Sequence, residues 1–275
     1  MVYLKPLIGY GSVRSNTVKS LLKAMKYKIL RFLLKTVGKL SKGISLGWRM
    51  GFDSGVMLEY VYENKPQGIT PLGVLIDRIY LSNKVWDGVR SRRQMLVEQL
   101  NNAISNYNHP QVFDLAAGVG SYLFLLPFDR ATIIAGDYND EAVNQGKAKA
   151  TTQGRSDIVF TLNDAFTLSA FASQKADILV SSGFFDILTE DEQIKTVLNN
   201  GSSITQPGAR WVFTIEENHP DLKLLQESLV DLNQKPWKLV LRPAQQLIDW
   251  AKPYGWELET LQRNDYFAVG TMVKR

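Results

Sequence analysis

The hydrophobic pattern divides the chain into an N-terminal helical part and a C-terminal part in which strands and helices alternate. Apolar side chains recur at spacings of three and four from residue 15 to residue 40, which predicts an amphipathic helix. Two more helices are predicted over residues 72–80 and 85–104. The segment between Gly43 and Gly68 is interrupted by several glycines and by Pro66. We therefore expect a helical extension ahead of the main domain.

From residue 111 onward, short runs of β-branched and aromatic residues alternate with helical patterns. The runs predict strands at residues 111–116, 131–136, 158–162, 176–181 and 210–215. Helices are expected at residues 140–153, 191–199, 221–232 and 243–254. Residues 256–261 and 266–274 are typical of a closing antiparallel pair. This alternation is that of a mostly parallel sheet with crossover helices.

A glycine turn follows the first of these strands. Gly118 and Gly120 come directly after the apolar run from Val112 to Leu115. Glycine permits positive φ and lets the main chain approach a ligand closely. The apolar run from Tyr122 to Leu126 predicts the start of a helix. In open α/β sheets, a strand–glycine–helix turn of this kind binds nucleotide-like ligands.

Chemically suitable side chains follow the next three strands at their carboxyl ends. Asp137 comes 17 residues after Gly120, where an acid can accept both hydroxyls of a ribose. Asp164 can take an adenine amino group while the ring packs on Phe166. Small residues, Ser181 and Ser182, precede Phe184 after the fourth strand. Four such features at successive strand ends indicate one nucleotide pocket.

The composition of the chain limits the kinds of metal site, cross-link and cellular location that are expected. The chain of 275 residues has no cysteine and two histidines, which excludes disulfides and thiolate sites and disfavours a multi-histidine metal site. We predict no metal. No apolar run approaches the about 18–20 residues of a membrane-spanning helix, and the N-terminal residues lack the charged-then-apolar pattern and small-residue cleavage site of a secretion signal. These observations favour a cytoplasmic protein.

The positive charge is concentrated at the N-terminus. The first 52 residues hold eleven Lys and Arg and no acid, although the whole chain has a net charge of only +5. A basic amphipathic helix fits peripheral contact with an anionic membrane through residues 15–42, at the inner membrane face. The alternative is that the apolar stripe packs on the protein body and the lysines are only solvated. Nucleic acid is not expected as a partner, because the segment has no base-reading or stacking module.

The order of these motifs resembles class I S-adenosylmethionine-dependent methyltransferases. The turn from Asp114 to Gly120 is similar to their first motif, Asp137 matches the ribose position, and Asp164 the adenine position. The absence of the third glycine of a dinucleotide site disfavours NAD. One departure is Ala116, where many members have glycine. The resemblance implies a Rossmann-like α/β fold with a seven-stranded, mostly parallel sheet and an antiparallel last strand.

A closer resemblance, to a bacterial family of methyltransferases with undefined acceptors, covers nearly the whole chain from Gly51. In that family this domain is sometimes fused to acyltransferase or α/β-hydrolase-like domains. The similar segments are residues 52–55, 60–62, 75–81, 86–92, 218–220, 237, 241–242 and 262–265. We expect a basic arm over residues 1–50, a helical extension that covers the cofactor site over residues 51–107, and a methyltransferase domain over residues 108–275.

The expected activity is methyl transfer from S-adenosyl-L-methionine to O or N of a small-molecule or lipid-like acceptor. The candidate cofactor-binding residues are Asp114, Ala116, Gly118, Gly120, Tyr122, Asp137, Tyr138, Asp164, Ala165, Phe166, Ser181 and Ser182. His219 is the candidate general base, since its ordinary pKa suits that role. Phe184 and Arg242 are candidates for the substrate. The alternatives are a non-catalytic cofactor-binding or membrane-tethering module and an NAD-dependent Rossmann enzyme.

Overall fold

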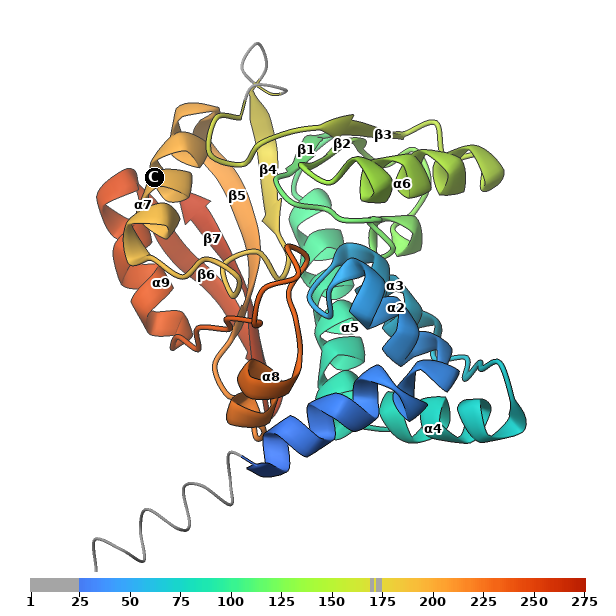
Figure 1. Ribbon diagram of the computed structural model, residues 1–275. Coiled ribbons are helices and arrows are strands. Elements are labelled where there is room, and N and C mark those ends of the chain that lie inside the picture. Colours follow the sequence, from blue (N-terminus) through green and yellow to red (C-terminus); the bar gives the residue numbers. More distant parts are fainter. Residues whose placement is uncertain (1–24, 169–170, 172–174) are drawn as a thin grey trace, which may run out of the picture.

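A single seven-stranded sheet is the framework of the protein (Figure 1). The computed structural model describes residues 25–168, 171 and 175–275. Within them the strand order is β3-β2-β1-β4-β5-β7-β6. The strands are β1 Gln111–Asp114, β2 Thr132–Asp137, β3 Ile158–Leu162, β4 Ala176–Ser181, β5 Thr205–Glu216, β6 Trp256–Arg263 and β7 Phe267–Lys274.

Strands β1 to β5 pair in parallel, and β7 runs antiparallel to both of its neighbours, β5 and β6. This confirms the predicted fold class, including the reversed last strand. The parallel arrangement places the carboxyl ends of β1 to β4 along one edge. The side chains that follow these strands in the sequence therefore meet there.

Helices cover both faces of the sheet. Neighbouring strand residues point to opposite faces, so Phe113 belongs to one apolar core while Val112 belongs to the other. The Phe113 side is covered by α7 Asp191–Ser203 and α9 Ala244–Ala251, on the left in Figure 1. The Val112 side is covered by α5 Lys84–Ile104 and α6 Asp140–Thr152.

The N-terminal part is helical, as predicted. Residues 25–35 form a helix, and residues 15–24 of the predicted helix lie outside the described residues. The short helix η1 Val37–Leu40, α2 Lys42–Met50, α3 Gly55–Glu63 and α4 Pro71–Leu81 follow. The glycine-interrupted segment thus holds two short helices, each capped by a serine hydroxyl: Ser41 accepts from Ile44 N, and Ser54 from Met57 N.

Asp77 of α4 joins these helices. Its carboxylate has no exposed surface and accepts hydrogen bonds from the Ser41 hydroxyl at 2.5 Å, from Gly43 N at 2.8 Å and from Gln67 N at 2.8 Å. It also accepts from the Tyr60 hydroxyl. One buried carboxylate therefore links α4 to α2, to α3 and to the loop between α3 and α4, and these hydrogen bonds satisfy its charge without a cation.

Three predicted boundaries were wrong. The helix expected to start at Tyr122 is a single turn, η2 Leu123–Leu125, because Pro127 has no N–H and disfavours a helical residue before it. The fifth strand, predicted to begin at residue 210, begins five residues earlier, at Thr205. Thr205 pairs with Ala176 of β4, and the register then shifts so that Arg210 pairs with Ile178. The helix predicted over residues 221–232 is only α8 Leu222–Ser228.

Candidate active site

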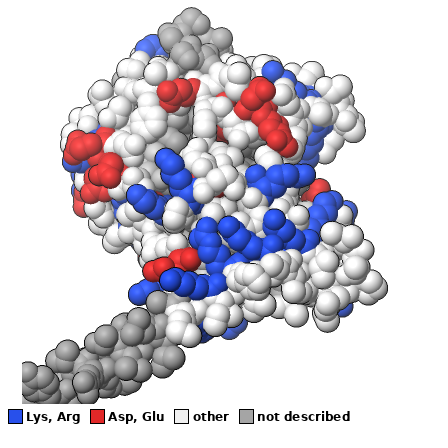
Figure 2. Space-filling model, in the orientation of Figure 1, with Lys and Arg blue, Asp and Glu red and all other residues white. Residues whose placement is uncertain are grey.

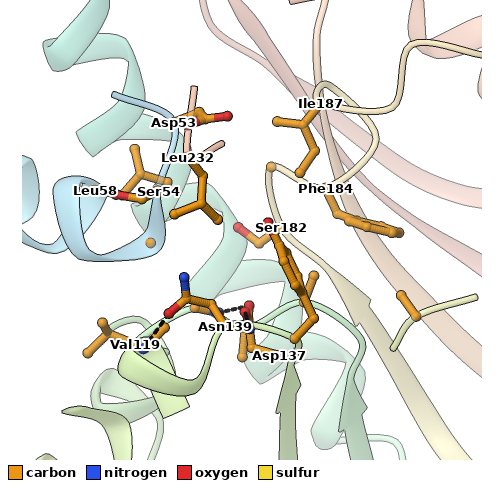
Figure 3. A pocket seen from close by; sticks show the side chains of 18 of the residues that line it. Asp53, Ser54, Leu58, Val119, Asp137, Asn139, Ser182, Phe184, Ile187 and Leu232 are labelled. Carbon is orange, nitrogen blue, oxygen red and sulfur yellow. Dashed lines mark hydrogen bonds between the residues drawn. The ribbon is translucent and has the colours of Figure 1, made fainter. Parts of the chain in front are cut away.

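A pocket of about 530 Å³ lies at the carboxyl ends of β1 to β4. This volume is in the roughly 300–1,000 Å³ range of small-molecule sites. Figure 3 shows Asp137 and Asn139 after β2, with Ser54 and Leu58 of α3 on one side and Phe184 and Ile187 on the other. The structure thus brings together the features that the sequence places after separate strands.

The glycine turn is held by the acid at the end of β2. Gly118 and Gly120 have φ of 59° and 66°, so both occupy the left-handed region that glycine tolerates. One oxygen of Asp137 accepts the Gly118 N–H at 2.7 Å, and the other accepts the Asn139 N–H at 2.8 Å. Burial raises the pKa of Asp137. Asp137 therefore fixes the turn in the free protein and presents its carboxylate at the pocket wall.

Polar and aromatic groups at the ends of β3 and β4 form the opposite wall. Asp164 accepts the Phe166 N–H at 2.9 Å, and the Phe166 ring lies 6.3 Å from that of Phe184. Asn163 is only 3% exposed, and neither its amide oxygen nor its nitrogen has a hydrogen-bond partner among the described residues. A buried amide without partners is costly, so this side chain is suited to a polar ligand in the pocket.

A wall that the strand-end motifs alone did not identify comes from α3 and the two residues before it. Asp53, Ser54, Gly55, Leu58 and Tyr62 all line the pocket. The main chain at the start of α3 approaches the glycine turn so closely that a Cβ on Gly55 would lie 2.7 Å from Gly118 Cα. The nearest sequence signal was the resemblance over residues 52–55 and 60–62.

Two glycines let this segment bridge between loops. Gly51 has φ of 88°, and a Cβ there would lie 2.3 Å from Leu232 N. Phe52 N donates to Val230 O at 3.0 Å. The loop after α8 also supplies Leu232 to the pocket, as Figure 3 shows. The residues from Gly51 to Gly55 therefore connect this loop to the glycine turn.

Most of the predicted cofactor-binding residues line this pocket. They are Ala116, Gly118, Gly120, Tyr122, Asp137, Tyr138, Asp164, Ala165, Phe166 and Ser182. The predicted substrate residue Phe184 lines it as well. Their roles in binding stay predictions, but their convergence on one cavity is what the strand-end argument requires.

Two of the predicted cofactor residues lie beneath the pocket. Asp114 has no exposed surface and accepts the Tyr122 hydroxyl and, at 3.3 Å, the Ala116 N–H. Burial raises the pKa of Asp114 to about 7. Ser181 is fully buried and accepts from Trp211 Nε1 at 3.0 Å. Both side chains support the residues that form the floor of the pocket.

Arg242 and His219 do not line the pocket. Arg242 is 3% exposed and donates to the carbonyl oxygens of Phe185, Leu188 and Thr189, at 2.9 to 3.4 Å, and to the Asp191 carboxylate at 3.1 Å. It therefore shapes the loop after β4, which contributes Leu188 and Thr189 to the pocket. Nδ1 of His219 accepts the Asp221 N–H, and burial lowers the pKa of its ring.

A buried charge cluster lies behind Gly183. Arg92 of α5 is 4% exposed, contacts the Tyr62 hydroxyl at 3.3 Å and lies 3.9 Å from the Asp186 carboxylate. Asp186 accepts from Glu216 N at 2.7 Å. Burial, and next the negative charge of Asp186, raises the pKa of Glu216 to about 9. A Cβ on Gly183 would lie 3.2 Å from Arg92, so the cluster borders the pocket wall.

The sequence places the chain in a known family. The pattern of a family described as "putative methyltransferase" matches residues 9–273. The chain belongs to this family. The uncharacterized protein YnbC of Escherichia coli K12 is 31% identical over 265 residues, which are 91% of this chain and 45% of that protein. The chain thus spans about half the length of this relative.

Solved structures share the fold of this methyltransferase-family chain. Magnesium protoporphyrin IX methyltransferase from Synechocystis, solved with bound S-adenosylhomocysteine, superposes with a TM-score of 0.58 at 14% identity, over 82% of this chain and 98% of its own. A Bordetella parapertussis protein described as a possible exported protein gives a TM-score of 0.64 at 18% identity, over 80% and 79%. The architecture is that of the class I methyltransferases.

Proposed function

We propose that this chain binds S-adenosylmethionine in the pocket at the ends of β1 to β4 and transfers its methyl group to a small-molecule or lipid-like acceptor. The observation that carries the proposal is the convergence of Gly118, Asp137, Asp164 and Phe166, from three successive strand ends, on one cavity. Membership of a methyltransferase family and the class I fold support it.

The polar and aromatic side chains of the pocket fit this cofactor. Asp137 offers carboxylate oxygens to ribose hydroxyls, and Asp164 offers one to an adenine amino group. Phe166 provides a ring face, and Asn163 has a buried amide that lacks partners among the described residues. When bound, S-adenosylmethionine supplies an already activated methyl group. The protein's own contribution is therefore to orient the two reactants and to exclude water.

An apolar acceptor is supported by the residues after β4. Phe184, Ile187 and Leu188, from the loop after β4, line the pocket, and Figure 3 shows the first two of them there. Arg242 holds their loop through three carbonyl oxygens, so this wall is fixed by the protein itself. These side chains suit an acceptor with a hydrocarbon portion.

Asp53 supports the proton transfer better than His219 does. It lines the pocket, and its Oδ1 has no hydrogen-bond partner among the described residues. Burial raises the pKa of Asp53 to about 6, which brings the carboxylate into the range of a general base near neutral pH. Figure 3 shows its carboxylate directed toward the cavity. We therefore assign Asp53 as the base when the acceptor loses a proton.

The proposal is tested with S-adenosylmethionine that carries a labelled methyl group. The purified chain is incubated with it and with aqueous and lipid extracts of bacterial cells, and the labelled product is identified. We expect label in a product that partitions into the organic phase. Gly118→Val is the control, since its Cβ would meet Gly55 in a backbone conformation that valine rarely adopts.

The outcomes separate the alternatives. Binding of S-adenosylhomocysteine without transfer to any extract would favour a non-catalytic cofactor-binding module. A thermal shift with NAD and none with S-adenosylhomocysteine would favour a dehydrogenase and overturn the proposal. Retained cofactor affinity in Gly118→Val would count against the assignment of the glycine turn.

A further inference from the structure

A large apolar surface lies apart from the pocket, on the N-terminal helices. Nine of the exposed large apolar side chains fall between residues 25 and 79 and form what we call the apolar face. They are Met25, Ile29, Phe32, Leu33, Val37, Ile69, Leu72, Leu75 and Ile79. Phe32 and Ile79 are each 65% exposed, and Ile69 is 79% exposed. Exposed apolar side chains gathered in this way mark an interaction site.

The helix over residues 25–35 directs apolar side chains both inward and outward. Tyr27 is buried, and Leu34 packs on the cluster that contains Ile44 and Trp48. Met25, Ile29, Phe32 and Leu33 lie on the opposite side at spacings of three and four and remain exposed. One apolar stripe of this helix therefore packs on the protein body, and a second faces away from it.

Helix α4 extends the same exposed surface. Leu72, Leu75 and Ile79 share one helical side, while Gly73, Asp77 and Leu81 on the other side are buried. Ile69, two residues before this helix, is also tied to η1, because its N–H donates to Leu40 O at 3.0 Å. Figure 1 shows the helix over residues 25–35 and α4 together at the base of the molecule. The apolar face therefore involves the helix over residues 25–35, η1 and α4, together with Ile69.

Exposed lysines lie in the same N-terminal segment as much of the apolar face, and this segment contains no acidic residue. Lys26, Lys28, Lys35, Lys39 and Lys42 are exposed, and no acid precedes Asp53. On the wheel of residues 25–35, lysines flank the exposed apolar side chains on both sides. Figure 2 shows Lys and Arg gathered in a band across the lower half of the visible face, beside the white surface where Figure 1 places α4.

We propose that the apolar face docks on an anionic phospholipid bilayer, with the side chains of residues 25–37 and 69–79 inserted at the interface and the lysines on lipid head groups. Apolar side chains bordered by cations match the apolar interior and the anionic surface of such a bilayer. Among the described residues no helix is long and apolar enough to cross a membrane, so this contact is peripheral. The proposal does not depend on the methyltransferase activity.

The test is cosedimentation of the full chain, without cofactor, with two kinds of vesicle. One kind is pure phosphatidylcholine, and the other contains about one third phosphatidylglycerol. We expect at least ten-fold tighter binding to the anionic vesicles and a loss of that difference at 0.5 M salt, because each lysine at the surface contributes about five-fold to affinity.

Two matched double variants then locate the contact. Phe32→Ser with Ile79→Ser removes one side chain of the apolar face from the helix over residues 25–35 and one from α4. Phe128→Ser with Leu125→Ser removes two side chains of similar exposure, 57% and 54%, outside the apolar face. All four side chains are exposed, so both variants fold. We expect the first to bind anionic vesicles at least ten-fold more weakly and the second to bind as the parent does.

Several results would overturn the proposal. They are equal binding of the parent to both vesicles, no binding to either, or equal loss of binding in the two double variants. Light scattering without lipid addresses a second copy of the chain as the occupant. A parent dimer that the first double variant converts to a monomer would assign the apolar face to self-association instead.

Discussion

The contact between Gly55 and Gly118 gives the most specific prediction about the pocket. Gly55→Ala adds one carbon 2.7 Å from Gly118 Cα, whereas unstrained carbon atoms lie about 3.5–4.0 Å apart. Because the opposing atom is main chain, it cannot turn aside as the end of a side chain does. The start of α3 and the glycine turn must therefore separate by about 1 Å.

The magnitude follows from two opposing terms. Overpacking at a rigid contact costs about 1–3 kcal/mol. Alanine in place of glycine in a helix contributes about 1 kcal/mol of stability, which offsets part of that cost. We therefore expect a loss of about 0–2 kcal/mol in the free energy of unfolding. A shift of about 1 Å in a pocket wall can cost up to about 100-fold in catalysis, so we expect at least a ten-fold loss of cofactor affinity.

The assay combines urea denaturation with calorimetric titration of S-adenosylhomocysteine. The control is Gly154→Ala, since a Cβ on Gly154 meets nothing within 4 Å, although Gly154, unlike Gly55, has a positive φ, 64°. The control loses about 1–2 kcal/mol of stability through its backbone conformation. Its cofactor affinity is that of the parent. Parental affinity in Gly55→Ala would refute the argument that α3 and the glycine turn form one site.

Four further predictions concern buried and pocket-lining groups. We expect Asp53→Asn to lower the rate of methyl transfer at least ten-fold and to leave the affinity for S-adenosylhomocysteine unchanged. In the parent the rate should rise through about pH 6 as Asp53 deprotonates, and this rise should be absent in the variant. A pH–rate profile of the variant that equals that of the parent would contradict this role of Asp53. The pKa of Glu216 in the folded protein is about 9, above its ordinary value of 4.5. The contribution of Glu216 to the free energy of unfolding is therefore present below pH 4.5 and is lost as the pH rises toward 9, by at most about 1.4 kcal/mol per pH unit. Glu216→Gln therefore flattens the fall in unfolding free energy between pH 5 and 9, and unchanged slopes in urea titrations would contradict the assignment. Asp77→Ala removes the acceptor of four hydrogen bonds and lowers the unfolding free energy by about 3–5 kcal/mol in the same titration, and a loss below 1 kcal/mol would show that the bonds are dispensable. Arg242→Lys cannot span the three carbonyl oxygens, so KM for the acceptor rises while affinity for S-adenosylhomocysteine stays parental; a change confined to the cofactor would contradict its placement.

The sheet could be predicted from the sequence because its information is local. Strands β1 to β4 are short apolar runs, and Asp137 and Asp164 lie at or just after the ends of two of them. Parallel pairing then brings those ends to one edge, so convergence of these residues needed no knowledge of distant contacts. The helix predicted at Tyr122 was wrong because Pro127, five residues later, outweighs the apolar pattern.

The parts of the site that depend on distant contacts could not be predicted. The sequence indicated Arg242 as a residue that could hold an acidic head group, but its guanidinium is buried against carbonyl oxygens more than fifty residues earlier in the chain. The position of Asp53, whose Oδ1 has no hydrogen-bond partner among the described residues, likewise depends on a contact between Gly51 and Leu232. Side-chain identity alone does not reveal which charged groups are enclosed by remote segments.

The cytoplasmic location inferred from the sequence stays a prediction, as do the acceptor class and the three domain boundaries. The chain spans about half of the Escherichia coli relative, so the activity of the longer protein is a separate matter. The proposal that S-adenosylmethionine binds in the pocket concerns residues of this chain alone.

Calorimetric titration of the parent and of Asp137→Ala with S-adenosylhomocysteine tests that claim most directly. The carboxylate of Asp137 both holds the Gly118 N–H and lines the pocket, so its removal affects the turn and the ligand together. We predict binding of one S-adenosylhomocysteine per parent chain, and at least ten-fold weaker binding to Asp137→Ala. No binding to the parent, or equal affinity in the two proteins, would contradict the account.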